Sequence, residues 1–294
     1  MNGEPYELRR AAGGTARLVV ERSTGRLLAG VGNDHQRAWV FPVNTPHGIG
    51  VTQESAFDHP FHRSIFVGQG LVNAGGREAQ FWAFQPDWRA PDNYIFSRIG
   101  LLRYEDPVVE QLADGFRFTY ETTWCDEELQ PMFDEVRVID VRSVQDATVV
   151  DLTTSKRASY ADVEFSRTKH GVIGVRVQPQ LLPVLGGQVI AVEKGERRSG
   201  SAEDVVNGRS CDYVAYEADV PSVGRYGVCL KALANTAADD LTGPWFCRDY
   251  GMAMFNPTHL APVHLRQGEV WTVALRTVAY DGALDHDRAA RWFG

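Results

Sequence analysis

Residues 135–142 read Glu135-Val-Arg-Val-Ile-Asp-Val-Arg142, in which apolar and polar side chains alternate. Successive side chains of a β-strand point to opposite faces, so this alternation predicts a half-buried strand. The same pattern occurs before it, in residues 115–121, and after a turn at Gln145-Asp146, in residues 148–153. Strands that follow one another without helices between them favour antiparallel pairing over a βαβ arrangement.

Further strand-like stretches lie on both sides of this segment, at residues 17–21, 174–178, 212–216, 226–230, 252–256 and 270–280. Helical periodicity is limited to a short turn near residues 202–206 and to residues 284–293. We therefore predict one all-β domain over residues 1–294. It is expected to be a large antiparallel β-sandwich with long capping loops and few short helices.

Composition excludes several classes of protein. The 294 residues are 44% hydrophobic and 23% charged, which is ordinary for a globular domain and excludes a disordered chain, a collagen and a coiled coil. The net charge of −8 argues against nucleic-acid and anionic-membrane partners, which need a basic face. No apolar run approaches a membrane span, and the first residues lack the features of a signal peptide. We expect a cytoplasmic protein.

Other absences narrow the choice of chemistry. No two of the four cysteines (Cys125, Cys211, Cys229 and Cys247) form a CxxC pair, so a structural zinc site is not expected. The nucleotide-binding glycine motifs, HExxH and a GxSxG nucleophile in its strand–helix context are also missing. We predict no cofactor, with a divalent metal as an alternative considered below.

Two long segments, residues 47–63 and 80–97, lack a regular pattern. Loops of this length are usually functional or disordered. Their aromatic residues oppose disorder and predict ordered loops over the mouth of the sandwich; they include Phe61, Phe81, Trp82, Phe84, Trp88 and Tyr94.

The first loop contains Asp58-His59-Pro60-Phe61-His62-Arg63. Imidazole is the side chain whose unperturbed pKa lies near neutrality, so two of them suit proton transfer or metal ligation. Two nearby loop histidines are more often hydrogen-bonded to backbone. The adjoining carboxylate and guanidinium tip the interpretation toward function.

Two further segments carry polar and aromatic groups. Thr168-Lys169-His170-Gly171 places an ammonium group beside an imidazole, which suits acid catalysis or an anionic or hydroxylated ligand, although the spacing alone favours a solvated surface turn. The third segment runs from Trp245 through Arg248, Asp249 and Tyr250 and ends in Asn256-Pro-Thr-His259. Aromatic faces with polar neighbours are typical of sugar-binding clefts, but Arg248 and Asp249 could also form a simple ion pair.

In their order along the chain, these segments resemble the bacterial "methane oxygenase PmoA" domain family. The matching motifs are His59-Pro-Phe-His62-Arg63, Gly70-Leu-Val-Asn73, Phe81-Trp82, Thr168-Lys-His-Gly171, Cys211-Asp-Tyr213, Trp245 to Gly251 and Tyr280-Asp-Gly282. They cover about residues 30–282. The resemblance implies a soluble β-sandwich similar to galactose mutarotase, and carbohydrate chemistry.

The first hypothesis is an enzyme that acts on a sugar or glycoside by epimerisation, elimination or hydrolysis. Its catalytic residues would be His59 and His62 as base and acid, with Lys169 and Asp249. The ligand is a small carbohydrate, and the expected binding residues are Arg63, Asn73, Trp82, His170, Arg248, Tyr250, Asn256 and His259.

Two alternatives remain. In a metal-dependent lyase or oxygenase, His59 and His62 would bind a divalent ion together with His170 or His259. In a non-catalytic sugar-binding module, the same aromatic and polar groups would bind without reacting, since fold does not fix function. The sequence leaves the oligomeric state open.

Overall fold

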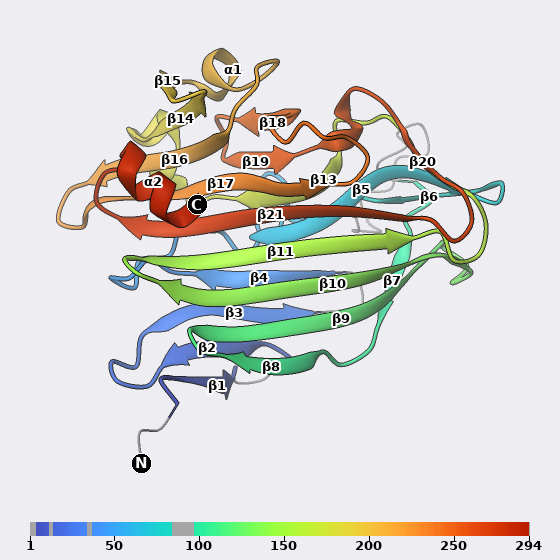
Figure 1. Cartoon of the computed structure of the whole chain (residues 1–294), viewed down its shortest axis with the longest axis horizontal. Helices are drawn as coiled ribbons and strands as arrows, with labels where there is room; N and C mark the ends of the chain where they lie inside the picture. Colours follow the sequence, from blue (N-terminus) through green and yellow to red (C-terminus); the bar gives the residue numbers. More distant parts are fainter. Residues whose placement is uncertain (1–3, 12–13, 34–36, 84–96, 294) are drawn as a thin grey trace.

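The predicted strands form two antiparallel sheets that lie face to face (Figure 1). The structure is a computed structural model that describes residues 4–11, 14–33, 37–83 and 97–293. Phe84, Trp88 and Tyr94 of the second long loop lie outside the described residues. The prediction of an all-β antiparallel sandwich with few short helices is confirmed.

The first sheet follows the order β1 (Tyr6–Arg10), β2 (Arg17–Glu21), β3 (Leu27–Asn33), β4 (Ala38–Val43), β5 (Ile65–Ala74), β13 (Gly171–Arg176), β19 (Met252–Phe255) and β18 (Trp245–Arg248). β6 (Arg77–Phe81) and β12 (Val163–Phe165) also pair with β5, and β20 (Val263–Leu265) pairs with β12. The first predicted motif, residues 58–63, lies in the loop just before β5, the second leads into β13, and the third includes β18 and β19, so this sheet brings the three motifs to neighbouring strands.

The second sheet follows the order β15 (Glu196–Gly200), β14 (Gln188–Glu193), β16 (Tyr213–Val220), β17 (Gly224–Asn235), β21 (Val270–Asp281), β11 (Ala147–Arg157), β10 (Pro131–Val144), β9 (Gly115–Cys125) and β7 (Leu101–Tyr104). β8 (Val108–Leu112) pairs with β9. The hairpin of β10 and β11 is in register from Asp134 opposite Arg157 to Val144 opposite Ala147. It contains the two alternating stretches on either side of the predicted turn.

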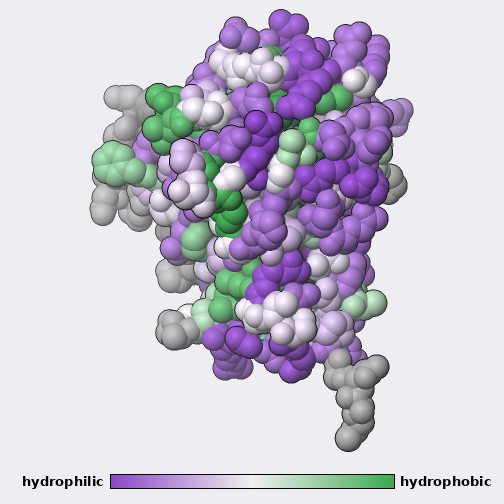
Figure 2. Space-filling model, turned by 90° about the vertical axis from the view of Figure 1, so that its left-hand side faces the viewer, coloured by the Kyte–Doolittle hydropathy of each residue, from purple (hydrophilic) through white to green (hydrophobic). Residues whose placement is uncertain are grey.

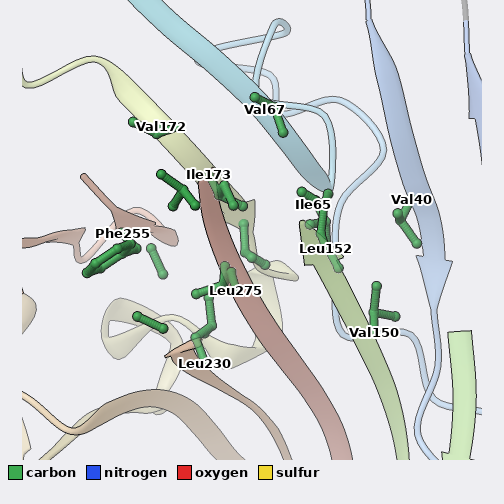
Figure 3. Packing of buried hydrophobic residues seen from close by; sticks show 14 of the residues in the cluster. Val40, Ile65, Val67, Val150, Leu152, Val172, Ile173, Leu230, Phe255 and Leu275 are labelled. Atoms are coloured by element: carbon green, nitrogen blue, oxygen red, sulfur yellow. The ribbon is translucent and has the colours of Figure 1, made fainter. Parts of the chain in front are cut away.

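The main core lies between the sheets. Ile65 and Val67 of β5 point toward Leu152 of β11 and Leu275 of β21 (Figure 3). Each of these side chains is essentially inaccessible to water. Their burial provides the main driving force for stacking the sheets.

Helices cover a small part of the molecule. α2 (His286–Phe293), at the predicted C-terminal position, lies over the outer face of the second sheet and packs Trp292 against Tyr280 (Figure 1). α1 (Ala202–Val205) is one turn long, and single 3₁₀ turns occupy residues 179–181, 183–185 and 257–259. No helix in the described part of the chain is both long enough and apolar enough to cross a membrane.

Hydrophilic residues cover most of the face seen in Figure 2, and hydrophobic residues appear there only in small groups.

The outer face of the first sheet carries a separate buried cluster. Because side chains alternate along a strand, Phe66 of β5 points away from Ile65 and Val67, and Met252 and Met254 of β19 share its face. Glycine makes room for these rings. A Cβ at Gly174 would lie 2.7 Å from the Phe66 ring.

Candidate active site

Four rings form a stack on the outer face of the first sheet. His59 lies between Tyr250 and His62, with ring centroids 5.3 Å and 4.8 Å apart and nearly parallel planes. His62 in turn stacks on Phe66 at 5.5 Å. The guanidinium of Arg176 lies 4.7 Å from the centroid of the Tyr250 ring at one end of the stack. At the other end, Arg37 lies 4.9 Å from Phe66.

A carboxylate holds His59 in place. Asp58 Oδ2 lies 2.8 Å from His59 Nδ1, and Asp58 Oδ1 accepts a hydrogen bond from Arg176. Burial alone would raise the pKa of Asp58, but the hydrogen bond with His59 and the charge of Arg176 outweigh it and lower that pKa. Asp58 is therefore a carboxylate at neutral pH, with both oxygens engaged. It fixes the orientation of the imidazole.

His59 is partly open to solvent, whereas His62 is not. The His59 side chain is 38% exposed, and no hydrogen bond involves its Nε2 in the described part of the chain. His62 is 2% exposed, and neither of its ring nitrogens has a partner there. Burial, and then the charges of His59 and Arg176, hold the pKa of His62 well below its ordinary value. It is a neutral ring packed behind His59.

Two more rings extend the cluster: Trp82 directly follows β6, and His170 directly precedes β13. The Trp82 ring contacts His62 edge-on at 5.0 Å and lies 5.4 Å from His170. Burial, with smaller effects of the Lys169 and His59 charges, lowers the pKa of His170 to about 4, so this ring is also neutral. Lys169 itself is exposed at the edge of the cluster.

The structure brings together one subset of the predicted residues, namely His59, His62, Trp82, Lys169, His170 and Tyr250. Two charged residues that contact this subset, Asp58 and Arg176, were not among the predicted site residues. Asp58 stands beside His59 in the sequence, but Arg176 follows it by 118 positions. The signal for Arg176 was its polarity at the end of an otherwise apolar strand, since β13 reads Gly-Val-Ile-Gly-Val-Arg.

Other predicted residues are engaged elsewhere. Asp249 Oδ1 accepts the backbone N–H of Ala202 at 2.6 Å, at the start of α1. Arg248 pairs with Glu203 at 3.2 Å and lies 4.0 Å from the Phe246 ring centroid. Arg248 therefore pairs with Glu203 and not with Asp249. Both residues link the turn between β18 and β19 to α1 and its surroundings.

Asn256 is fully buried and structural in its contacts. Its Nδ2 donates to the carbonyl of Thr168 at 2.8 Å, and its Oδ1 accepts from Thr258 at 2.8 Å. These bonds fix the segment that carries Lys169. His259, on the adjacent 3₁₀ turn, lies 6.0 Å from the Phe246 ring, and burial lowers its pKa.

The contacts of Arg63 and Asn73 lie outside the ring stack. Arg63 contacts Glu54 at 3.4 Å and lies 5.0 Å from the Trp39 ring. Asn73, near the far end of β5 from Phe66, lines a surface pocket together with Asp162 and Glu164.

The stack disfavours the alternative in which His59 and His62 bind one metal ion together. A metal bound to imidazole lies in the ring plane, where the nitrogen lone pair points. The His59 and His62 rings are stacked with planes only 2° apart, so in this arrangement their lone pairs do not converge on one ion. Within the described residues, no group of three or more His, Cys, Asp or Glu side chains is placed to hold a metal.

The fold and this cluster define an antiparallel β-sandwich protein with an imidazole–carboxylate pair on the outer face of its first sheet. The chain matches the model of a family of unknown function, DUF6807, over residues 27–293, and it belongs to that family. The match does not support the name methane oxygenase PmoA that the motifs suggested. A search among curated proteins found no match.

Several solved structures are similar to the chain, among them the following three. One is an Escherichia coli K12 protein provisionally assigned as an aldose 1-epimerase, with 10% identity, coverage of 95% of this chain and 100% of that chain, and a TM-score of 0.40. The galactosidase domain of the alpha-galactosidase–sucrose kinase AgaSK has 12% identity, coverage of 96% and 41%, and a TM-score of 0.38. A galactose mutarotase related enzyme from Lactobacillus acidophilus has 9% identity, coverage of 95% and 100%, and a TM-score of 0.29. At these values the similarities carry no conclusion about activity or site residues.

Proposed function

We propose that the protein is a carbohydrate-active enzyme in which His59 moves a proton to and from a bound sugar. The observation that carries this proposal is the 2.8 Å contact between Asp58 and His59 Nδ1. It orients a partly exposed imidazole whose other nitrogen has no partner in the described part of the chain. An oriented imidazole is a common general base and acid in enzymes.

Each neighbour has a distinct role in this proposal. The carboxylate of Asp58 fixes the tautomer with the proton on Nδ1 and stabilises the imidazolium when Nε2 takes a proton. Arg176 keeps Asp58 ionised and is a positioning residue. His62 is too buried to exchange protons with a ligand, so it serves as the packed support behind His59.

The arrangement favours epimerisation or elimination over hydrolysis. Glycoside hydrolases generally place two carboxyl groups on either side of the scissile bond. Within the described part of the chain, Asp58 is the carboxylate that contacts the ring stack, and both of its oxygens are engaged. In an isomerisation, Nε2 takes one proton from the sugar and returns one to it, so the reaction consumes no proton.

The rings around His59 support a sugar as the ligand. Sugars present C–H faces that pack on aromatic rings, and hydroxyl groups that need hydrogen-bond partners. Tyr250 is partly exposed beside His59, and the exposed Lys169 with the partly exposed His170 supplies polar groups nearby.

The experiment is a panel of aldoses and keto-sugars followed by NMR in deuterated water, which detects both epimerisation and proton exchange. We expect His59→Asn to lower turnover by about 10²–10⁴-fold. Asp58→Asn should lower it by up to about 10⁴-fold, because the imidazole remains but loses the carboxylate that fixes its tautomer.

The matched control is His264→Asn, since His264 is an exposed histidine on β20. It should leave turnover unchanged, and the turnover of every variant is expressed per folded molecule, with the folded fraction taken from urea denaturation. Full turnover in His59→Asn would refute the role of His59. Saturable sugar binding without turnover, unchanged in His59→Asn, would identify a non-catalytic binding module.

A further inference from the structure

Among the residues that the structure describes, hydrogen-bond donors and positive charges dominate the surroundings of His59, although the whole chain carries a net charge of −8. Of these residues, Asp58 is the carboxylate in contact with the stack, and both of its oxygens are already engaged. Arg176 is 3% exposed, and its Nε and Nη1 have no hydrogen-bond partner in the described part of the chain. Buried charged donors without partners are costly and call for an acceptor or a compensating negative charge.

The exposed edge of the cluster is also cationic. Lys169 is one of two exposed lysines, and no ion pair involves it in the described part of the chain. Its charge acts on the neighbouring His170, and the permanent charges of Arg176 and Arg37 act on His62. The second exposed lysine, Lys194, lies at the turn between β14 and β15 in the other sheet.

We propose that the substrate is a sugar acid, whose carboxylate binds the ammonium group of Lys169 while its ring lies against His59 and Tyr250. This inference rests on the proposed function and specifies its substrate class. Arg176 is too buried for direct contact and contributes through its charge. A carboxylate suits the site better than a phosphate, because one exposed ammonium group matches one negative charge, whereas phosphate sites usually gather several donors.

Buried cationic groups also explain why a neutral sugar would be the weaker ligand. Its hydroxyl groups would find partners, but the positive charge would remain uncompensated. A charge-assisted hydrogen bond is about twice as strong as a neutral one, so the preference for the acid should be about tenfold or more at low salt. Since Lys169 is exposed, the preference should shrink as salt screens its charge.

The test is isothermal titration calorimetry with glucuronate and galacturonate, their neutral parents glucose and galactose, and glucose 6-phosphate, at low salt and again at about tenfold higher NaCl. The whole chain is used throughout. The wild type should bind the better uronate about tenfold more tightly than its neutral parent. In Lys169→Met this ratio should fall to about two or less, whereas Lys169→Arg should retain most of it.

Lys194→Met is the matched control, because it removes an exposed lysine elsewhere and should leave the ratio unchanged. Neutral sugars that bind as tightly as the uronates, or a ratio that survives Lys169→Met, would overturn the inference. Tighter binding of glucose 6-phosphate than of either uronate would overturn the choice of a carboxylate.

The outcomes also separate this inference from the proposed function. Turnover of neutral sugars that depends on His59 and shows no preference for acids would refute the inference and leave the proposed function in place. If no sugar of either kind is bound or converted, both fail. Binding of uronates that depends on Lys169, with turnover that depends on His59, would support both.

Discussion

Two of the regions in which the protein buries ionisable groups can be compared, one inside the sandwich and one on the outer face of the first sheet. The inner group lies on β10 and β11, where Arg137 pairs with Glu135 at 2.7 Å and both side chains are 0% exposed. Lys156 stands opposite Glu135, with its Nζ 4.8 Å from the Trp271 ring. The outer group is the stack around His59.

Both regions contain groups whose pKa values depart far from their ordinary values, so such shifts alone do not identify a functional site. Burial lowers the pKa of Lys156 to about 7, a larger change than that of His170. The two regions differ in their exposure to water. Every member of the inner group is closed off from water, whereas His59 and Asp58 reach the surface. We therefore expect the inner group to bear on stability, and under the proposed function the outer group bears on chemistry.

The largest expected effect is the loss of Arg137. Removing one partner of a buried ion pair leaves an uncompensated charge, which typically costs about 3–5 kcal/mol of unfolding free energy. We therefore expect Arg137→Met to lower the stability measured by urea denaturation by that amount. Turnover per folded molecule should be unchanged, because the pair lies on the opposite side of the first sheet from His59.

The control for this prediction is a surface pair that also involves β10. Arg117 contacts both oxygens of Asp140, at 2.7 and 2.8 Å, but its side chain is 41% exposed. Arg117→Met should cost less than about 1 kcal/mol. The double variant Glu135→Gln/Arg137→Met should recover part of the loss, because the neutral amide put in place of Glu135 would still accept from Trp124 Nε1. Equal losses in the buried and surface variants would refute the contrast.

A smaller effect, of opposite sign, is expected for Lys156→Met. In the folded protein Lys156 loses its proton near pH 7, whereas in the unfolded chain it does so near pH 10.4. Between these values the unfolded chain binds more protons, so wild-type stability rises with pH. Below pH 7 the native state bears the full cost of burying the ammonium group, partly offset by Glu135.

We therefore expect Lys156→Met to be more stable than the wild type by about 1–4 kcal/mol at pH 6, with an advantage that shrinks toward pH 10. Urea denaturation at pH 6, 8 and 9.5 measures this trend. Lys194→Met, which removes an exposed lysine, should show no such trend. A variant that is less stable than the wild type at pH 6 would mean that the attraction between Lys156 and Glu135 exceeds the cost of burial.

The sequence predicts the inner region better than the outer one. The alternation in residues 135–142 and 148–153 correctly places β10 and β11, and residues 270–280 almost match β21. These strands have one apolar face, and a period of two is visible in a single sequence. The exposed edge strand β15 has no apolar face, and no pattern predicts it.

The outer region depends on contacts that periodicity does not encode. His59 and His62 were recognised by residue type, but their stacking follows from the path of one loop. The contact between Asp58 and Arg176 follows from the pairing of β13 with β5, which brings distant segments together. Asp249 shows the converse. Its position in an aromatic motif suggested catalysis, whereas its side chain accepts a backbone N–H from α1.

The smallest expected effect is the change in stability of the outer region at acidic pH, which depends on His62. His62 stays neutral in the folded protein because its pKa lies well below the ordinary value of 6.5, but in the unfolded chain it takes a proton below about pH 6.5. The unfolded chain then binds more protons, so stability falls as pH decreases through this window. His62→Phe keeps a ring in the stack and removes the titration.

At pH 8 the stability of His62→Phe should lie within about 1 kcal/mol of the wild type. At pH 5 it should be about 2 kcal/mol higher relative to that baseline, since the window from 6.5 to 5 spans about 1.5 pH units at 1.36 kcal/mol each. The exposed His264→Phe is the control and should show no such gain. An equal gain at pH 5 in the control would show that the response to acid is not specific to His62. No gain in His62→Phe would mean that His62 is protonated in the folded protein. It would then be available as the acid that the sequence first suggested.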